Sequence, residues 1–170
     1  MSGLLVWITG LSGAGKTTIA NALYKKIIKH HSNTLLLDGD SFRYILGGNS
    51  GYTKEERFEV GFKIARMCNF LISQNMNVIC ATISLFKEIH YFNRSNIKNY
   101  FEVFVDVDMK ELIKRDSKGL YNGALKGDIK NVVGVDIAYD RPKDSDLILH
   151  NSSNVSVETQ VDKILYLIDL

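Results

Sequence analysis

Proline and cysteine are scarce in this sequence, which has one proline and two cysteines among 170 residues. Cys68 and Cys80 lie in apolar segments and show neither the spacing of a zinc site nor the pattern of a secreted disulfide framework, so we expect both to be reduced core residues. The single Pro142, together with the lack of repeats and low-complexity tracts, leaves no linker. We therefore expect residues 1–170 to form one domain.

The sequence also lacks a strong excess of charge and any long apolar run. Its 21 basic and 19 acidic residues leave a formal net charge of +2, which does not predict a nucleic-acid-binding surface. No apolar stretch approaches the roughly 18 residues of a membrane-spanning helix, and the first residues lead into a strand pattern rather than a leader peptide. We expect a cytoplasmic enzyme that binds neither nucleic acid nor membrane.

Five short apolar runs alternate with segments of helical periodicity. The runs predict strands at 4–9, 34–37, 77–81, 101–105 and 146–149. Apolar side chains repeat on one face over residues 16–30 and 54–73, which predicts two crossover helices. This alternation indicates an α/β fold with a mostly parallel five-stranded sheet flanked by helices.

A glycine-rich motif follows the first expected strand. It reads Gly10-Leu11-Ser12-Gly13-Ala14-Gly15-Lys16-Thr17 and matches G-x-x-x-x-G-K-[ST] at each fixed position. In such a loop the backbone N–H groups surround phosphate oxygens, Lys16 reaches the β and γ phosphates, and the Thr17 hydroxyl holds Mg²⁺. We expect the nucleotide to be bound by Gly10, Ser12, Gly13, Ala14, Gly15, Lys16, Thr17 and Thr18. The alternative is a glycine-rich turn that binds nothing, which the strand before the motif and the helix after it disfavour.

Two aspartates and an arginine follow the second expected strand, in Asp38-Gly39-Asp40-Ser41-Phe42-Arg43. The carboxyl ends of parallel strands line the ligand crevice, so we expect both aspartates to face the phosphate loop. A carboxylate there can orient waters of Mg²⁺ or accept a proton from an attacking hydroxyl, and Arg43 can pair with an anionic acceptor. The alternative for Asp38 is that it caps a short helix. Further along, Lys118 precedes a segment with four glycines between 119 and 134, which indicates a lid at about 117–134.

Several longer motifs carry a family resemblance. They include "VWITGLSGAGKTTIA", "LLLDGDSFR", "GYTKEER", "TISLFK" and "KRDSKGLYNGALKGDIKNVVGVDIAYDRP". With these motifs the chain resembles, over nearly its full length, the adenylyl-sulfate kinases, which use ATP to phosphorylate the 3′-hydroxyl of adenosine 5′-phosphosulfate. The resemblance implies a sandwich like that of P-loop nucleoside triphosphate hydrolases, ATP and Mg²⁺, and a homodimer, since the relatives are commonly dimers.

The resemblance also implies roles for individual residues. Asp40 would be the general base on the ribose hydroxyl, while Lys16 and Lys118 would contact the phosphates in transit. The acceptor would be bound by Asp38, Asp40, Arg43, Tyr52, Arg57, Lys63, Ile83, Ser84, Lys118 and Leu120. Some family members carry a phosphoserine at the position of Ser84. Because no general base lies near Ser84 in the sequence, we expect it to donate a hydrogen bond at a strand end instead.

The sequence departs from this family in the acceptor site. Val60-Gly61-Phe62-Lys63 stands where the family has Asn-Ile-Arg-Arg, and Val132 replaces one of two aromatic residues that sandwich adenine, Tyr52 being the other. Base stacking on an aromatic side chain is worth about 1–3 kcal/mol, so this loss predicts a changed acceptor. The pattern resembles the cytidine diphosphoramidate kinases of bacterial capsule pathways, which phosphorylate the 3′-hydroxyl of a cytidine nucleotide.

Three alternatives stay open from the sequence. The first is an adenylyl-sulfate kinase that makes 3′-phosphoadenylyl sulfate. The second is a GTPase-like switch, which would require an Asn-Lys-x-Asp guanine motif that the sequence does not contain. The third is an inactive partner subunit. This alternative is disfavoured by four residues that are intact, Lys16, Thr17, Asp40 and Lys118.

Overall fold

A parallel β-sheet forms the centre of the protein. The computed structural model describes residues 3–48, 51–116, 118–152 and 154–169, and in these ranges five strands pair in the order β2-β3-β1-β4-β5. Every pair of neighbouring strands is parallel. The strands are β1 (Leu5–Thr9), β2 (Thr34–Asp38), β3 (Asn77–Thr82), β4 (Tyr100–Asp106) and β5 (Leu147–His150). The expected five-stranded α/β fold is confirmed.

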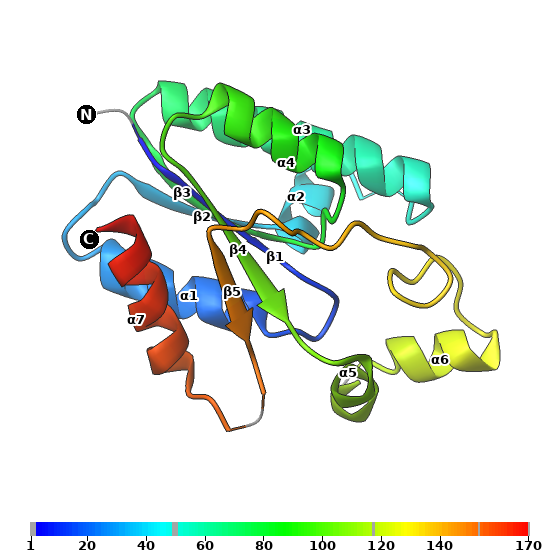
Figure 1. Ribbon diagram of the computed structural model, residues 1–170. Coiled ribbons are helices and arrows are strands. Elements are labelled where there is room, and N and C mark those ends of the chain that lie inside the picture. Colours follow the sequence, from blue (N-terminus) through cyan, green and yellow to red (C-terminus); the bar gives the residue numbers. More distant parts are fainter. Residues whose placement is uncertain (1–2, 49–50, 117, 153, 170) are drawn as a thin grey trace.

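Helices cover both faces of the sheet (Figure 1). α3 and α4 lie on one face, and α1 and α7 lie on the other. The described helices are α1 (Lys16–Ile27), α2 (Gly39–Ile45), α3 (Lys54–Ser73), α4 (Lys87–Asn96), α5 (Met109–Arg115), α6 (Leu120–Lys126) and α7 (Val157–Ile168). In the ranges that the structure describes, none of these helices is long and apolar enough to cross a membrane.

The central strand β1 is buried on both sides. Alternate side chains of a strand point to opposite faces, so Val6 and Ile8 join the core under α1 and α7, whereas Leu5 and Trp7 join the core under α3 and α4. This double burial explains why the sequence of β1 is an uninterrupted apolar run. Cys68 and Cys80 are buried and free, as the sequence predicts.

The start of α3 is fixed by its own sequence. The Thr53 hydroxyl accepts a hydrogen bond from the Glu56 N–H at 3.2 Å, and the Glu56 carboxylate accepts one from the Thr53 N–H at 3.0 Å. This reciprocal capping box satisfies N–H groups that have no partner within the helix. It places Arg57 in the first turns of α3, beside the carboxyl edge of the sheet.

Loops and short helices extend beyond that edge. Figure 1 shows α5, α6 and the segment after α6 beyond the carboxyl end of β4, on the side to which the strands point. The phosphate loop follows β1, α2 follows β2, and residues 83–86 follow β3. Segments that are far apart in the sequence therefore meet at one edge of the sheet, which is where ligands bind in open α/β sheets.

Candidate active site

A cavity of about 770 Å³ lies at the carboxyl edge of the sheet. Most of the residues predicted from the sequence line it. They are Ser12, Gly13, Gly15, Lys16, Thr17, Thr18, Asp38, Asp40, Arg43, Tyr52, Arg57, Ile83, Ser84, Lys118 and Leu120. Gly10, Ala14 and Lys63 are not part of this lining. Lys63 is exposed on α3, so its predicted contact with the acceptor has no support in the structure.

Gly10 and Ala14 support the phosphate loop on the side that packs against the protein. A Cβ atom on Gly10 would lie 2.6 Å from the Val105 carbonyl oxygen, so only glycine lets the chain pass so close to β4. Ala14 is buried, and its N–H donates to the Leu11 carbonyl at 3.2 Å. Both residues support the shape of the loop, and their contact with the nucleotide stays a prediction.

Lys16 is almost fully buried at the base of the cavity. Its Nζ donates to the Leu11 carbonyl oxygen at 2.8 Å, which turns the ammonium group toward the phosphate loop. Burial lowers the pKa of Lys16 from 10.5 to about 8; the negative charge of Asp40 opposes this shift and the positive charge of Lys118 adds to it. A buried cation that is only partly compensated favours an anion in the space beside it.

The two aspartates after β2 have different surroundings. Asp38 Oδ1 accepts from the N–H groups of Asp40 at 3.0 Å and Ser41 at 2.8 Å, and Oδ2 accepts from the Ser41 hydroxyl at 2.9 Å. Asp38 thus caps α2, the alternative that the sequence left open. The Asp40 side chain is exposed, and its Oδ2 lies 3.8 Å from Nζ of Lys118, which is also exposed. Such an exposed pair contributes little to stability, so both side chains can turn toward a ligand.

The oxygen atoms near the phosphate loop fit Mg²⁺. Mg²⁺ prefers oxygen ligands and keeps several of its waters. The Thr17 hydroxyl and the carboxylates of Asp38 and Asp40 line the same cavity and are of this type. Because both Asp38 oxygens already accept hydrogen bonds at the start of α2, Asp38 would orient waters of the ion, while Thr17 would bind it through its hydroxyl.

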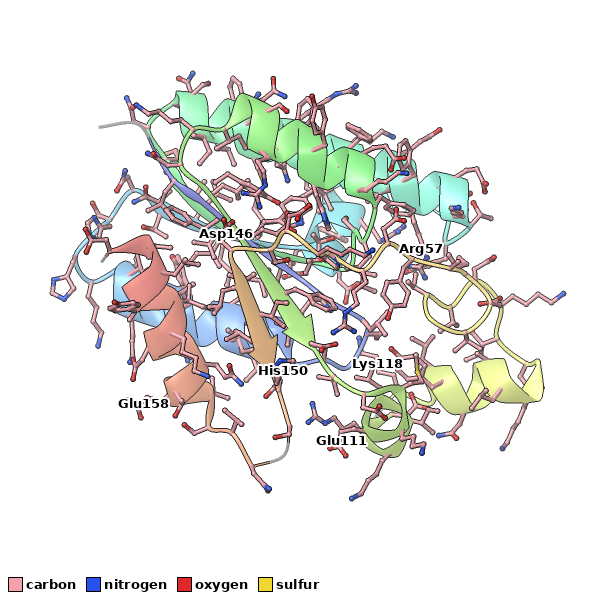
Figure 2. All side chains as sticks on the ribbon, in the orientation of Figure 1. Arg57, Glu111, Lys118, Asp146, His150 and Glu158 are labelled. Carbon is pink, nitrogen blue, oxygen red and sulfur yellow. The ribbon has the colours of Figure 1, made fainter. Side chains whose placement is uncertain are left out.

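Two arginines line the side of the cavity that faces α3. The Cζ atoms of Arg43 and Arg57 lie over the Tyr52 ring, 4.5 and 5.1 Å from its centroid. Arg43 donates to the Gly51 carbonyl at 2.7 Å, and Arg57 donates to the carbonyls of Tyr52 and Asn131, both at 2.8 Å. Figure 2 shows Arg57 where the start of α3 meets the segment that follows α6, and Lys118 between α5 and α6.

Ser84 is buried at the end of β3. Its hydroxyl lies 2.9 Å from the Thr82 hydroxyl, and its carbonyl oxygen lies 2.9 Å from Nε2 of His90. Since a carbonyl can only accept, the proton of this bond belongs to Nε2. Gly61 packs against the same residue, because a Cβ atom there would lie 2.9 Å from Ser84 Oγ and 2.5 Å from Ile89 Cδ1. The glycine that replaces the family's isoleucine at position 61 therefore fits the close packing against Ser84 and Ile89.

The segment around α6 is tied to the phosphate loop by contacts that the sequence did not reveal. The Tyr121 hydroxyl donates to the Ser12 carbonyl at 2.8 Å, and Asp116 accepts from the N–H groups of Tyr121 and Asn122 at 3.1 and 2.9 Å. Arg115 donates to the Asn151 carbonyl at 2.7 Å. Four of these residues belong to the motif "KRDSKGLYNG", which marks the segment but does not identify its partners Ser12 and Asn151. Residue 117, at the start of the predicted lid, lies outside the described residues.

The segment after α6 closes the cavity from the other side. The Asp136 carboxylate accepts hydrogen bonds from the N–H groups of Asn131 and Val132, and these bonds lower the pKa of Asp136. Asn131 adopts the left-handed conformation, with φ at 65°. Val132 is 2% exposed and packs into the core, although it also borders the cavity. The wall at this position is therefore aliphatic, and it offers no aromatic ring to a base.

A phosphate loop, a buried lysine and an exposed carboxylate at the edge of a parallel sheet fit a nucleotide-dependent phosphotransferase. The family model for adenylylsulphate kinase matches residues 2–150. A cytidine diphosphoramidate kinase of Campylobacter jejuni is 47% identical over 161 residues, which cover 95% of this chain and 94% of that protein. An adenylyl-sulfate kinase of Pseudomonas aeruginosa is 40% identical over 151 residues, covering 88% of this chain and 77% of that protein. The chain belongs to the adenylylsulphate kinase family.

Solved structures agree with this assignment. A structure of a Mycobacterium tuberculosis APS kinase in complex with AMPPNP and APS superimposes with a TM-score of 0.89 at 30% identity and covers 99% of both chains. The resemblance inferred from the sequence is thereby confirmed, and so is the expectation of a kinase.

Proposed function

We propose that the protein transfers the γ-phosphoryl group of MgATP to the 3′-hydroxyl of a cytidine nucleotide with a modified terminal phosphate, cytidine diphosphoramidate. The observation that carries the proposal is the composition of the cavity wall. The phosphate loop and the Arg43–Arg57 pair line one cavity, whereas Val132 fills the wall where an aromatic ring would face a purine. The cytidine diphosphoramidate kinase that is 47% identical supports the same acceptor.

Each residue of the site has a separate role in the proposed reaction. Asp40 accepts the proton of the 3′-hydroxyl as the bond from this oxygen to the γ phosphorus forms. The bond between the γ phosphorus and the β–γ bridging oxygen breaks, and ADP leaves with that electron pair. Lys16 and Lys118 offset the negative charge on the phosphoryl oxygens, and Thr17 would hold Mg²⁺, which supplies further charge neutralisation. A general base contributes about 10²- to 10⁴-fold, so positioning and charge supply the rest.

The proposal extends to the lid, the oligomeric state and the location of the protein. Residues 118–134 act as a lid that excludes water from the reaction, a role supported by the bond from Tyr121 to the phosphate loop. The chain acts as one domain and forms a homodimer, which the family resemblance favours. It acts in the cytoplasm, which the free Cys68 and Cys80 favour. Sedimentation velocity tests the dimer directly.

The second candidate is adenylyl-sulfate kinase activity, which the Pseudomonas aeruginosa and Mycobacterium tuberculosis relatives favour. Measurement of kcat/KM for cytidine diphosphoramidate and adenosine 5′-phosphosulfate at fixed MgATP decides between the two. We expect at least a tenfold preference for the cytidine acceptor, and a tenfold preference for the sulfate compound would refute the proposal. ADP release without any acceptor would indicate a switch, and no release with either acceptor would indicate an inactive partner.

A further inference from the structure

Asn151 directly follows β5, in a segment that no step of the proposed reaction uses. Figure 2 labels its neighbour His150 at the carboxyl end of that strand. The backbone of Asn151 is held on two sides, because its N–H donates to the Asp106 carbonyl at 3.1 Å and its carbonyl accepts from Arg115 at 2.7 Å. A backbone fixed in this way gives the half-buried side chain a defined direction.

The side chain of Asn151 points at the phosphate loop. Its Nδ2 donates to the Ala14 carbonyl at 2.8 Å, a bond between residues 137 positions apart. Since a carbonyl can only accept, the nitrogen of the amide and not its oxygen faces Ala14. A Cβ atom on Gly15 would lie 2.5 Å from the same nitrogen. Glycine at position 15 therefore admits the Asn151 amide as well as the positive φ of 95°.

The bond to Ala14 also fixes the direction of a neighbouring N–H group. The Ala14 carbonyl and the Gly15 N–H belong to one planar trans peptide unit, so they point in opposite directions. Asn151 holds the carbonyl on the side of β5, and the N–H is thereby turned to the other side. Gly15 lines the cavity, and the N–H groups of such a loop are the groups that bind phosphate oxygens.

A second carbonyl of the loop is held in the same manner. The Ser12 carbonyl accepts from the Tyr121 hydroxyl at 2.8 Å. A carbonyl that turned toward the phosphates would place its partial negative charge beside them. Side chains from the segments after β4 and β5 thus hold two carbonyls of the loop from outside.

We propose that Asn151 is a positioning residue for the nucleotide, whose side-chain amide orients the Ala14–Gly15 peptide unit for binding of the triphosphate. This inference rests on one half of the proposed function, the binding of MgATP, and not on the identity of the acceptor. A loop whose peptide units are already oriented loses less conformational freedom when the phosphates bind, which strengthens binding.

Binding of the triphosphate with and without its nucleoside tests this role. The Kd of AMPPNP with Mg²⁺ is measured by calorimetry, and the Kd of inorganic tripolyphosphate by its competition with AMPPNP. Asn151→Ala removes the amide and keeps both backbone bonds, whereas Asn151→Asp keeps the size of the side chain and replaces the donor by an acceptor. Asn33→Ala is the matched control, because the Asn33 amide donates to the Asn75 carbonyl at 2.6 Å, at the amino end of β2 and outside the cavity lining.

We expect Asn151→Ala to weaken AMPPNP binding about fivefold, the effect of losing one neutral hydrogen bond. Asn151→Asp should weaken it by about tenfold or more, since a carboxylate repels both the carbonyl oxygen and the phosphates. Tripolyphosphate should lose affinity by the same factors as AMPPNP. Asn33→Ala should stay within about twofold of the wild type for both ligands, because its lost bond is of the same kind but lies away from the loop.

Unchanged AMPPNP affinity in Asn151→Ala would overturn the inference, as would an equal loss in Asn33→Ala. A loss for AMPPNP without a loss for tripolyphosphate would overturn it too, because the effect would then lie on the nucleoside. Urea unfolding identifies a variant that does not fold, and Asn151→Asp decides by the same criteria if Asn151→Ala fails to fold. These measurements need no turnover, so a wild type that binds AMPPNP but does not phosphorylate the cytidine nucleotide would refute only the proposed function.

Discussion

Replacing Lys16 by methionine should make the ligand-free protein more stable near neutral pH. Lys16 is buried, and burial lowers its pKa from 10.5 to about 8. Between these pH values the unfolded chain binds more protons than the folded protein, so the free energy of unfolding rises with pH. A shift of this size corresponds to about 3 kcal/mol, because each pKa unit is worth about 1.4 kcal/mol.

The substitution Lys16→Met removes the free-energy cost of burying a charged lysine, together with one hydrogen bond. The lost bond is the one to the Leu11 carbonyl, and a hydrogen bond from a charged group is worth about 1.5–3 kcal/mol. Methionine has a similar length and no charge. We therefore expect the variant to be more stable than the wild type by about 1 kcal/mol near pH 7 and less stable near pH 10, where Lys16 is neutral in the folded protein.

Urea unfolding of both proteins near pH 7 and pH 10 tests this reasoning. The difference in the free energy of unfolding between variant and wild type should change by about 2–3 kcal/mol across this range. Lys29→Met is the control, because Lys29 is exposed in the turn that follows α1. A difference that stays constant with pH, or that moves in the opposite direction, would refute the burial of a charged Lys16. Phosphoryl transfer should be lost in Lys16→Met at either pH.

Three further substitutions test the site and its support. Asp40→Asn should lower kcat by about 10²- to 10⁴-fold and leave the Kd of AMPPNP within about twofold, and an unchanged kcat would remove Asp40 from the role of base. Tyr121→Phe removes the hydroxyl that donates to the Ser12 carbonyl, so a loss of about 1 kcal/mol should raise the KM for ATP several-fold, whereas an unchanged KM would contradict this coupling. Gly10→Ala brings a Cβ atom within 2.6 Å of the Val105 carbonyl oxygen, and we expect urea unfolding to show a loss of about 2–4 kcal/mol.

The parts of the fold that follow from local pattern were predictable from the sequence. Strands buried on both faces give continuous apolar runs, and α3 begins and ends at the residues that its periodicity predicts. Apolar periodicity continues to Ile28 and therefore predicts a helix that reaches residue 30, whereas the helix after the phosphate loop ends at Ile27. The short helices α5 and α6 have too few turns to show a clear period.

The contacts between distant segments were not predictable in the same way. The bond from Tyr121 to Ser12 joins residues 109 positions apart, and nothing in either local sequence specifies it. Asp38 was expected to face the phosphate loop or to cap a helix, and the structure shows that a residue at a strand end can do both. Lys63 was assigned to the acceptor from the family pattern, but the side of α3 that lines the cavity carries Arg57, Val60 and Ile64.

The two sides of the cavity are built by different parts of the chain, as the order of the strands shows. In the proposed function, the nucleotide side is built by the loop after the central strand β1 and by the segment after β4, whereas the arginine pair comes from the segments that follow the edge strand β2. Substitutions around residues 43–60 can therefore alter which acceptor fits without disturbing the loop that holds the triphosphate. This division gives the scaffold a route by which one phosphoryl donor can serve acceptors of different chemistry.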